Sequence, residues 1–296
     1  MSGMSDPEKT TLDRPATAGD LLLERFDAAG TAYRTALAGA PVEALGQRRP
    51  GDDYTLGGLA HHVNAVLQHY LGTAQAALAA GPAETAAPDS SRVFAEADAR
   101  VGLTPDAAER DAALARTAEL HEAVRRLLAG LDDRDWSRVT PVRFGPGDPY
   151  PTRPADVLAW LTDHYAEHAA QVTSLLADWR TLGAVEAFGR AFATRDAGAV
   201  MACMTEDCVF ENTTPAPDGE RLAGAAAVGD FWRRFFASTP SARFVPEETF
   251  VAGDRGLVRW TFEWDEGPEN RGHVRGVDVL RVRDGRVAEK LSYVKG

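Results

Sequence analysis

The feature that most constrains the fold is a change in apolar periodicity near Leu182 and Gly183. After this point, short helical stretches are expected near 183–194, 196–204 and 224–237. The remaining runs, in which apolar and polar side chains alternate between turn residues, predict five strands: CVFENT, RFVPEETFVA, GLVRWTFEWD, HVRGVDVLRVRD and RVAEKLSYVK. Before this point, apolar side chains recur every three or four residues, as in amphipathic helices. This helical pattern fills four long segments, near 17–39, 55–80, 104–131 and 152–179. Because no strand pattern separates them, we predict an all-α up-down four-helix bundle followed by an α+β domain.

Turn residues and composition set the expected domain limits. Residues 1–15 read as a disordered tail, residues 16–180 as the bundle, and residues 183–296 as the second domain. The stretch GPAETAAPDSS is rich in small residues and proline, so it predicts a long crossover connection between the second and third helices. The third helix is expected to open at Thr104, with Pro105 at its first position.

Composition excludes several classes of partner. The net charge of the 296 residues is −12, which disfavours binding to nucleic acid or to an anionic membrane. No apolar run approaches the roughly 20 residues that span a bilayer, and the N-terminus lacks the apolar core of a signal peptide. Two cysteines, Cys203 and Cys208, are too few for a disulfide framework. A cytoplasmic location is therefore expected.

The strongest chemical signal is a pair of histidines within the apolar stripe of the fourth helical segment. At spacings of three and four residues, the stripe reads Val157, Leu161, His164, His168, Val172 and Leu175. Side chains four residues apart lie one turn apart on one face of a helix, so both imidazoles can approach a single ion. Burying two unpartnered imidazoles costs free energy, which favours a shared ligand.

A third ligand is expected from the second helical segment. At about 100° per residue, His62 lies at the edge of that segment's apolar stripe, His69 lies about 20° from His62, and His61 points away. We therefore predict a metal site formed by His62, His164 and His168, with His69 as the alternative third ligand. Three imidazoles leave a coordination position open, as in catalytic sites. They suit zinc, nickel, iron or copper.

The segments that carry these histidines resemble the DinB-like metalloprotein superfamily. The resemblance rests on YTLGGLAHHVNAVLQHYL and DVLAWLTDHYAEHAAQVTSLL, and it spans roughly residues 17–180. It implies a four-helix bundle whose ligand positions are occupied by His62, His164 and His168. The superfamily includes mycothiol-dependent maleylpyruvate isomerases and thiol S-transferases. The resemblance therefore implies a divalent metal, zinc, nickel or iron(II), that lowers the pKa of a thiol or of water, with mycothiol as co-substrate.

The second domain resembles the SnoaL-like domains, relatives of ketosteroid isomerase and nuclear transport factor two. The resemblance is carried by VEAFGRAFATRDAGAVMACMTEDCVFENT and RGVDVLRVRDGRVAEKLSYVK. It implies a cone-shaped α+β fold in which a curved sheet wraps around helices and leaves an apolar cavity. It also places Phe188 and Asn212 where ketosteroid isomerases have a tyrosine and the general base. Only Asp278 keeps the identity of that family.

These replacements disfavour steroid-isomerase chemistry, because phenylalanine cannot donate a hydrogen bond and an amide cannot take up a proton at neutral pH. Asp278 remains the candidate catalytic residue, as a buried acid with a raised pKa. The candidate residues lining the pocket are Phe188, Asn212, Trp232, Trp260 and Tyr293.

The predicted function is that of a metal-dependent transferase, isomerase or hydrolase acting on a small electrophilic or hydrophobic metabolite. One alternative places catalysis or ligand binding in the SnoaL-like domain, as an isomerase, hydrolase or cyclase, and makes the bundle metal structural. Another is a noncatalytic small-molecule-binding protein. Both folds often self-associate, so a homodimer is expected by analogy.

Overall fold

A computed structural model describes residues 17–295, and the tail expected at residues 1–15 lies outside them. The chain divides into two compact units, Met1–Val172 and Thr173–Gly296. Among the described residues, no helix combines the length and the apolar character that crossing a bilayer requires.

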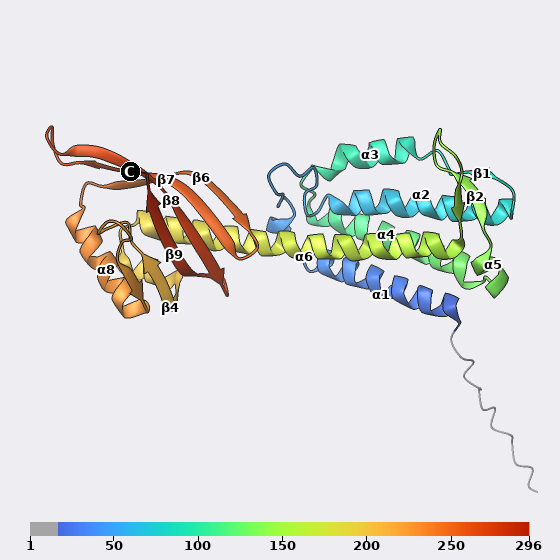
Figure 1. The fold of residues 1–296 in the computed structure, drawn as a ribbon, viewed down its shortest axis with the longest axis horizontal. Coiled ribbons are helices and arrows are strands. Elements are labelled where there is room, and N and C mark those ends of the chain that lie inside the picture. Colours follow the sequence, from blue (N-terminus) through green and yellow to red (C-terminus); the bar gives the residue numbers. More distant parts are fainter. Residues whose placement is uncertain (1–16, 296) are drawn as a thin grey trace, which may run out of the picture. The chain divides into compact units, whose positions relative to one another are not determined.

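Four long helices build the first unit (Figure 1). They are α1 (Ala18–Ala38), α2 (Leu59–Ala80), α4 (Ala107–Ala129) and α6 (Pro154–Ala193). Reciprocal hydrogen bonds between Thr17 and Asp20 cap α1, and a second capping box opens α4 with Asp106 as its N-cap. The start predicted at Thr104 is therefore wrong, because the Asp106 carboxylate satisfies a free amide of the first turn and Thr104 does not.

The long connection between α2 and α4 contains a helix that the sequence pattern did not reveal, α3 (Ser91–Val101). It returns the chain, so α2 and α4 run in the same direction side by side (Figure 1). Helices α1 and α6 also run in the same direction, and the rings of Tyr33 and Tyr165 lie 5.7 Å apart between them. At the start of α2, Thr55 donates a hydrogen bond to the Leu103 carbonyl. Further along, the Asn64 side chain accepts from the Thr117 hydroxyl of α4. The predicted crossover stretch, residues 81–91, forms the first part of this connection, and α3 forms most of the rest.

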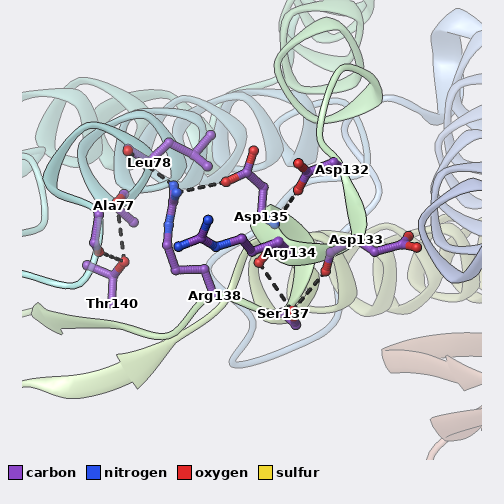
Figure 2. A network of polar contacts seen from close by, with 10 residues as sticks. Ala77, Leu78, Asp132, Asp133, Arg134, Asp135, Ser137, Arg138 and Thr140 are labelled. Carbon is purple, nitrogen blue, oxygen red and sulfur yellow. Dashed lines mark hydrogen bonds and ion pairs between the residues drawn. The ribbon is translucent and has the colours of Figure 1, made fainter.

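A small sheet also interrupts the bundle, so the expectation of no strands between the helices is wrong. Strand β2 (Thr140–Arg143) lies between β1 (Thr85–Ala86) and β3 (Tyr150–Thr152). Figure 2 shows the hydrogen bonds that join the start of β2 and the segment before it to the end of α2. Arg138, which follows the short helix α5 (Asp133–Ser137), bonds to Asp135 and to the Leu78 carbonyl, and Thr140 bonds to the Ala77 carbonyl.

Helix α6 is continuous through residues 154–193, whereas the sequence pattern suggested two helices with a break near Gly183. No proline lies between residues 155 and 193. A single glycine costs a helix interior only about 1 kcal/mol, which packing can offset. The helix therefore contributes its N-terminal part to the first unit and its C-terminal part to the second.

The second unit is an α+β domain with a cone-shaped, curved sheet of six strands in the order β5-β4-β9-β8-β7-β6. Only β4 and β9 pair in parallel. The strands are β4 (Met204–Glu211), β5 (Arg221–Ala223), β6 (Arg243–Ala252), β7 (Arg255–Asp265), β8 (Arg271–Arg283) and β9 (Arg286–Val294). Strand β5 is the one that alternation did not predict. The end of α6 and helices α7 (Ala197–Ala202) and α8 (Ala225–Ser238) share an apolar core with this sheet.

Candidate functional site

Three histidines from two helices meet inside the first unit. The ring centroid of His62 on α2 lies 5.1 Å from that of His164 and 5.1 Å from that of His168, both on α6. The two α6 rings are 4.3 Å apart. One ring nitrogen from each residue lies within 4.8 Å of the other two. The helical spacing of His164 and His168 produces this convergence, because side chains four residues apart lie over one another on one helix face.

Hydrogen bonding leaves nitrogen lone pairs free in this cluster. Nδ1 of His168 lies 2.8 Å from Oε1 of Gln171, so a proton on Nδ1 donates to the amide oxygen and Nε2 keeps its lone pair. Nε2 of His164 is buried and has no hydrogen-bond partner among the described residues. His62 is half-buried, with the ring of Tyr54 packed edge-on at 5.1 Å. A buried imidazole nitrogen without a partner is costly unless something else binds it.

Burial keeps the three imidazoles neutral at ordinary pH. Loss of solvent, together with the neighbouring His168 and His62, lowers the pKa of His164 to about 3. Desolvation and the nearby His168 also lower the pKa of His62, and desolvation lowers the pKa of His168. The neutral form is the one that binds a metal. The donor set, three uncharged nitrogens with one of them unpartnered, therefore fits a divalent ion that accepts imidazole, such as zinc, nickel or iron(II).

The other histidines of the bundle lie outside this cluster. Nδ1 of His69, the alternative third ligand, is 3.0 Å from the Ser90 hydroxyl, and its ring packs against Tyr70 and Phe94. His121 is buried, stacks on Phe26 and bonds to Asp27, so it has a packing role. The helical angles left His62 and His69 only about 20° apart, and in the structure His62 is the one that faces His164 and His168 of α6.

The second unit contains two neighbouring cavities. One, of about 350 Å³, is lined mainly by apolar side chains of α6, β6, β7 and β8, among them Phe188. The charged residues Asp278 and Lys290 also line it. The other, of about 680 Å³, is lined by aromatic residues of α8, β6 and β7, with the loop after β4. Phe192, Phe244 and Lys290 line both.

Asp278, the predicted catalytic acid, is buried in an ion pair. Its Oδ1 lies 2.8 Å from Nζ of Lys290 and accepts a hydrogen bond from the Ser292 hydroxyl at 2.7 Å. Asp278 is therefore buried, as expected, but it lies beside an ammonium group that the sequence pattern did not reveal. Sequence reasoning missed Lys290 and Ser292. Their shared parity on one strand was visible, but their pairing with β8 was not.

The candidate lining residues divide between the cavities, with one exception. Phe188 lines the smaller cavity, and Asn212, Trp232 and Trp260 line the larger one. Tyr293 does neither; it is 50% exposed. Its prediction as a pocket residue is wrong because successive side chains of a strand point to opposite faces, and the cavity side belongs to Ser292 and Val294.

Comparison with known proteins assigns each unit to a family. The DinB superfamily matches residues 25–172, and the SnoaL-like domain matches residues 185–290. No curated protein matches the chain.

Similar solved structures correspond to the second unit. An NTF2-like protein of unknown function from Mesorhizobium loti is 43% identical over 40% of this chain and 93% of its own, with a TM-score of 0.36. An epoxide hydrolase from M. tuberculosis, described as LEH-like, is 24% identical over 40% and 84%, with a TM-score of 0.34. A polyketide cyclase homologue from Sinorhizobium meliloti is 23% identical over 37% and 93%, with a TM-score of 0.31. The chain thus belongs to the DinB superfamily through its helical bundle, to which a SnoaL-like, NTF2-like domain is fused.

Proposed function

We propose that this chain is a metal-dependent enzyme whose bundle holds a divalent ion between His62, His164 and His168. The observation that carries the proposal is the buried, unpartnered Nε2 of His164 beside two further imidazoles. A divalent ion in such a site lowers the pKa of a thiol or a water molecule, which makes a nucleophile at neutral pH. The substrate class is a small electrophilic or hydrophobic metabolite, with mycothiol as the candidate thiol.

The composition of the cluster supports a catalytic site over a purely structural one. Structural zinc sites are almost always closed by four protein ligands. Here the group of converging metal-binding side chains has three members among the described residues, and all three are histidines. Asp163 and Glu167, which precede the two α6 histidines, are exposed. His62 and His164 are both half-buried, whereas His168 is buried.

The surrounding side chains orient the ligands. The Gln171 amide lies one turn beyond His168 and accepts from its Nδ1, which fixes both the tautomer and the ring orientation. Tyr54 packs against His62 and limits the rotation of that ring. Neutral imidazoles in the free protein favour metal uptake, because no proton has to be displaced.

Cobalt substitution provides a test that needs no knowledge of the substrate. We would load the full chain with Co²⁺ and titrate it with mycothiol, following the visible spectrum. An open position that accepts a thiol gives a new sulfur-to-cobalt charge-transfer band in the near ultraviolet, and the His164→Ala variant gives none. If cobalt binds to the wild type but mycothiol leaves the spectrum unchanged, the proposal of a thiol-dependent reaction is wrong.

The second unit is the competing location for catalysis, because it buries a charged side chain, Asp278, against a cavity. The two locations predict opposite variant behaviour. If the bundle carries the reaction, His164→Ala abolishes turnover and Asp278→Asn retains it once folding is verified. The reverse pattern would assign catalysis to the SnoaL-like domain and leave the metal a structural role.

A further inference from the structure

Lys290 is the one charged residue that lines both cavities of the second unit. Its side chain is 6% exposed and that of Asp278 is 4% exposed. Nζ lies 2.8 Å from Oδ1 of Asp278 and donates to the Ser292 hydroxyl at 2.6 Å, and that hydroxyl donates in turn to the same Oδ1. The three groups form a closed triangle with no net charge.

The hydrogen bonds within this triangle leave some of its donors and acceptors without a partner in the triangle. An ammonium has three N–H donors, and hydrogen bonds of Lys290 account for two. Beyond these, Nζ lies over the rings of Phe210 and Trp232, 5.1 Å and 5.8 Å from their centroids. Lys290 and Ser292 both contact Oδ1 of Asp278. One N–H donor of Lys290 and the acceptor Oδ2 of Asp278 are therefore left for a guest in the cavities.

We propose that Lys290 is a specificity-determining residue that selects neutral ring compounds with a carbonyl oxygen, which accepts the remaining Lys290 N–H. This inference goes beyond the metal-dependent function and does not depend on it. The aromatic lining supplies the preference for a ring, since ring faces pack on Trp232, Phe231 and Phe235 of α8. The single buried cation supplies the preference for an acceptor oxygen.

The charge of the triangle decides between a neutral guest and an anion. A carboxylate placed against Lys290 would add a second negative charge next to Asp278, and the three groups would together carry one net negative charge inside an apolar cavity. Burial of an uncompensated charge is strongly unfavourable. A ketone oxygen accepts the same N–H without that cost. The guest is therefore neutral.

Three matched naphthalenes test this inference on the wild-type full chain. We would measure binding of 2-acetonaphthone, 2-ethylnaphthalene and 2-naphthoate by quenching of tryptophan fluorescence, with EDTA present so that the bundle metal plays no part. A hydrogen bond from a charged donor contributes about 1.5–3 kcal/mol, so the ketone should bind about 10- to 100-fold more tightly than the hydrocarbon. The naphthoate should bind more weakly than the ketone.

Variants assign the difference to Lys290. Lys290→Met should lower the affinity for the ketone to the affinity for the hydrocarbon. Lys295→Met, the same change at an exposed lysine of the C-terminal end, should leave the ratio of the two affinities unchanged. Because Lys290→Met leaves Asp278 unpaired, the double variant Asp278→Asn/Lys290→Met serves as a second test without a buried charge. Retained hydrocarbon binding reports that the cavity is folded.

Several outcomes would overturn the inference. Equal affinity of the wild type for ketone and hydrocarbon, or no binding of either up to the solubility limit, excludes the ketone preference. Naphthoate binding more tightly than the ketone makes the cavity an anion site. A ketone preference that survives in both variants removes Lys290 from recognition. None of these results bears on metal binding, so failure here and failure of the metal-dependent function are separable.

Discussion

The two units bury their polar groups in opposite ways. In the SnoaL-like unit, Asp278, Lys290 and Ser292 satisfy one another within 2.8 Å, so the charges are balanced without a guest. In the bundle, the rings of His62, His164 and His168 face one another, and Nε2 of His164 has no partner among the described residues. Three lone pairs that converge do not satisfy one another.

This difference separates a charge-balanced polar cluster from an incomplete one. Removing one member of the balanced cluster should damage the fold, because its partner becomes a buried, unpaired charge. Removing His164 from the incomplete cluster should damage binding more than folding, since its Nε2 has no hydrogen bond among the described residues to lose.

The largest effect is expected from breaking the buried ion pair. Lys290→Met should lower the free energy of unfolding by about 3–5 kcal/mol, because it leaves the Asp278 carboxylate buried without its cation. Denaturant unfolding measures this loss. The double variant Asp278→Asn/Lys290→Met should recover most of it, since both charges are gone. If the double variant is as unstable as the sum of the single ones, the pair is not the unit of stability.

Loss of a histidine ligand should have the next largest effect. His164→Ala should weaken Zn²⁺ binding by at least about 100-fold, more than the 10- to 100-fold cost of removing a group that only orients a ligand. Competition with a chromogenic chelator at pH 7 measures this change. His69→Ala provides the matched control, because His69 is on α2 and half-buried but lies outside the cluster. Equal losses in both variants would contradict a specific site.

Removal of the group that orients His168 should have a smaller effect. Gln171→Ala removes the acceptor of the His168 Nδ1 proton and should weaken Zn²⁺ binding by about 10-fold. Gln171→Glu restores an acceptor and should restore affinity. The same chelator competition applies, and an unchanged affinity in Gln171→Ala would show that the hydrogen bond does not position the ligand.

The smallest expected effect is on the pH dependence of stability. The pKa of His164 is about 3 in the folded, metal-free protein and near 6.5 when unfolded. Between these values the unfolded chain binds more protons, so this group's contribution is complete above pH 6.5 and is lost as pH falls towards 3. Urea midpoints of metal-free wild type between pH 7.5 and 5 should therefore fall more steeply than those of His164→Leu. Parallel curves would contradict buried, neutral imidazoles.

Periodicity predicted the fold well where elements are long. Three of the bundle helices, the start of α6 and five of the six strands of the large sheet were expected within a few residues, because their apolar spacing extends over many turns or alternations. Helix α3 and the small sheet were missed. The strands β1, β2 and β3 have two to four residues each, too few to show a period. The continuity of α6 depended on packing that outweighs the cost of Gly183.

For the candidate sites too, the spacing within one element could be predicted, but the pairing of distant segments could not. The predicted histidines converge as their helical angles indicated, whereas metal binding stays a prediction. In the second unit, Asp278 was found but its partner was not, because Lys290 reaches it only through the register that pairs Asp278 with Ser292 across β8 and β9. A single sequence carries no signal of that register. Tyr293 was chosen for its aromatic ring, although its parity within β9 already placed it opposite Lys290.

The most direct test of the central claim is an anomalous difference map, recorded at the zinc absorption edge from crystals of the full chain grown with Zn²⁺. The account predicts one strong peak per bundle, about 2.0–2.1 Å from a ring nitrogen of each of His62, His164 and His168. A map that shows zinc bound to other side chains, with no peak at these three rings, would contradict the three-histidine site.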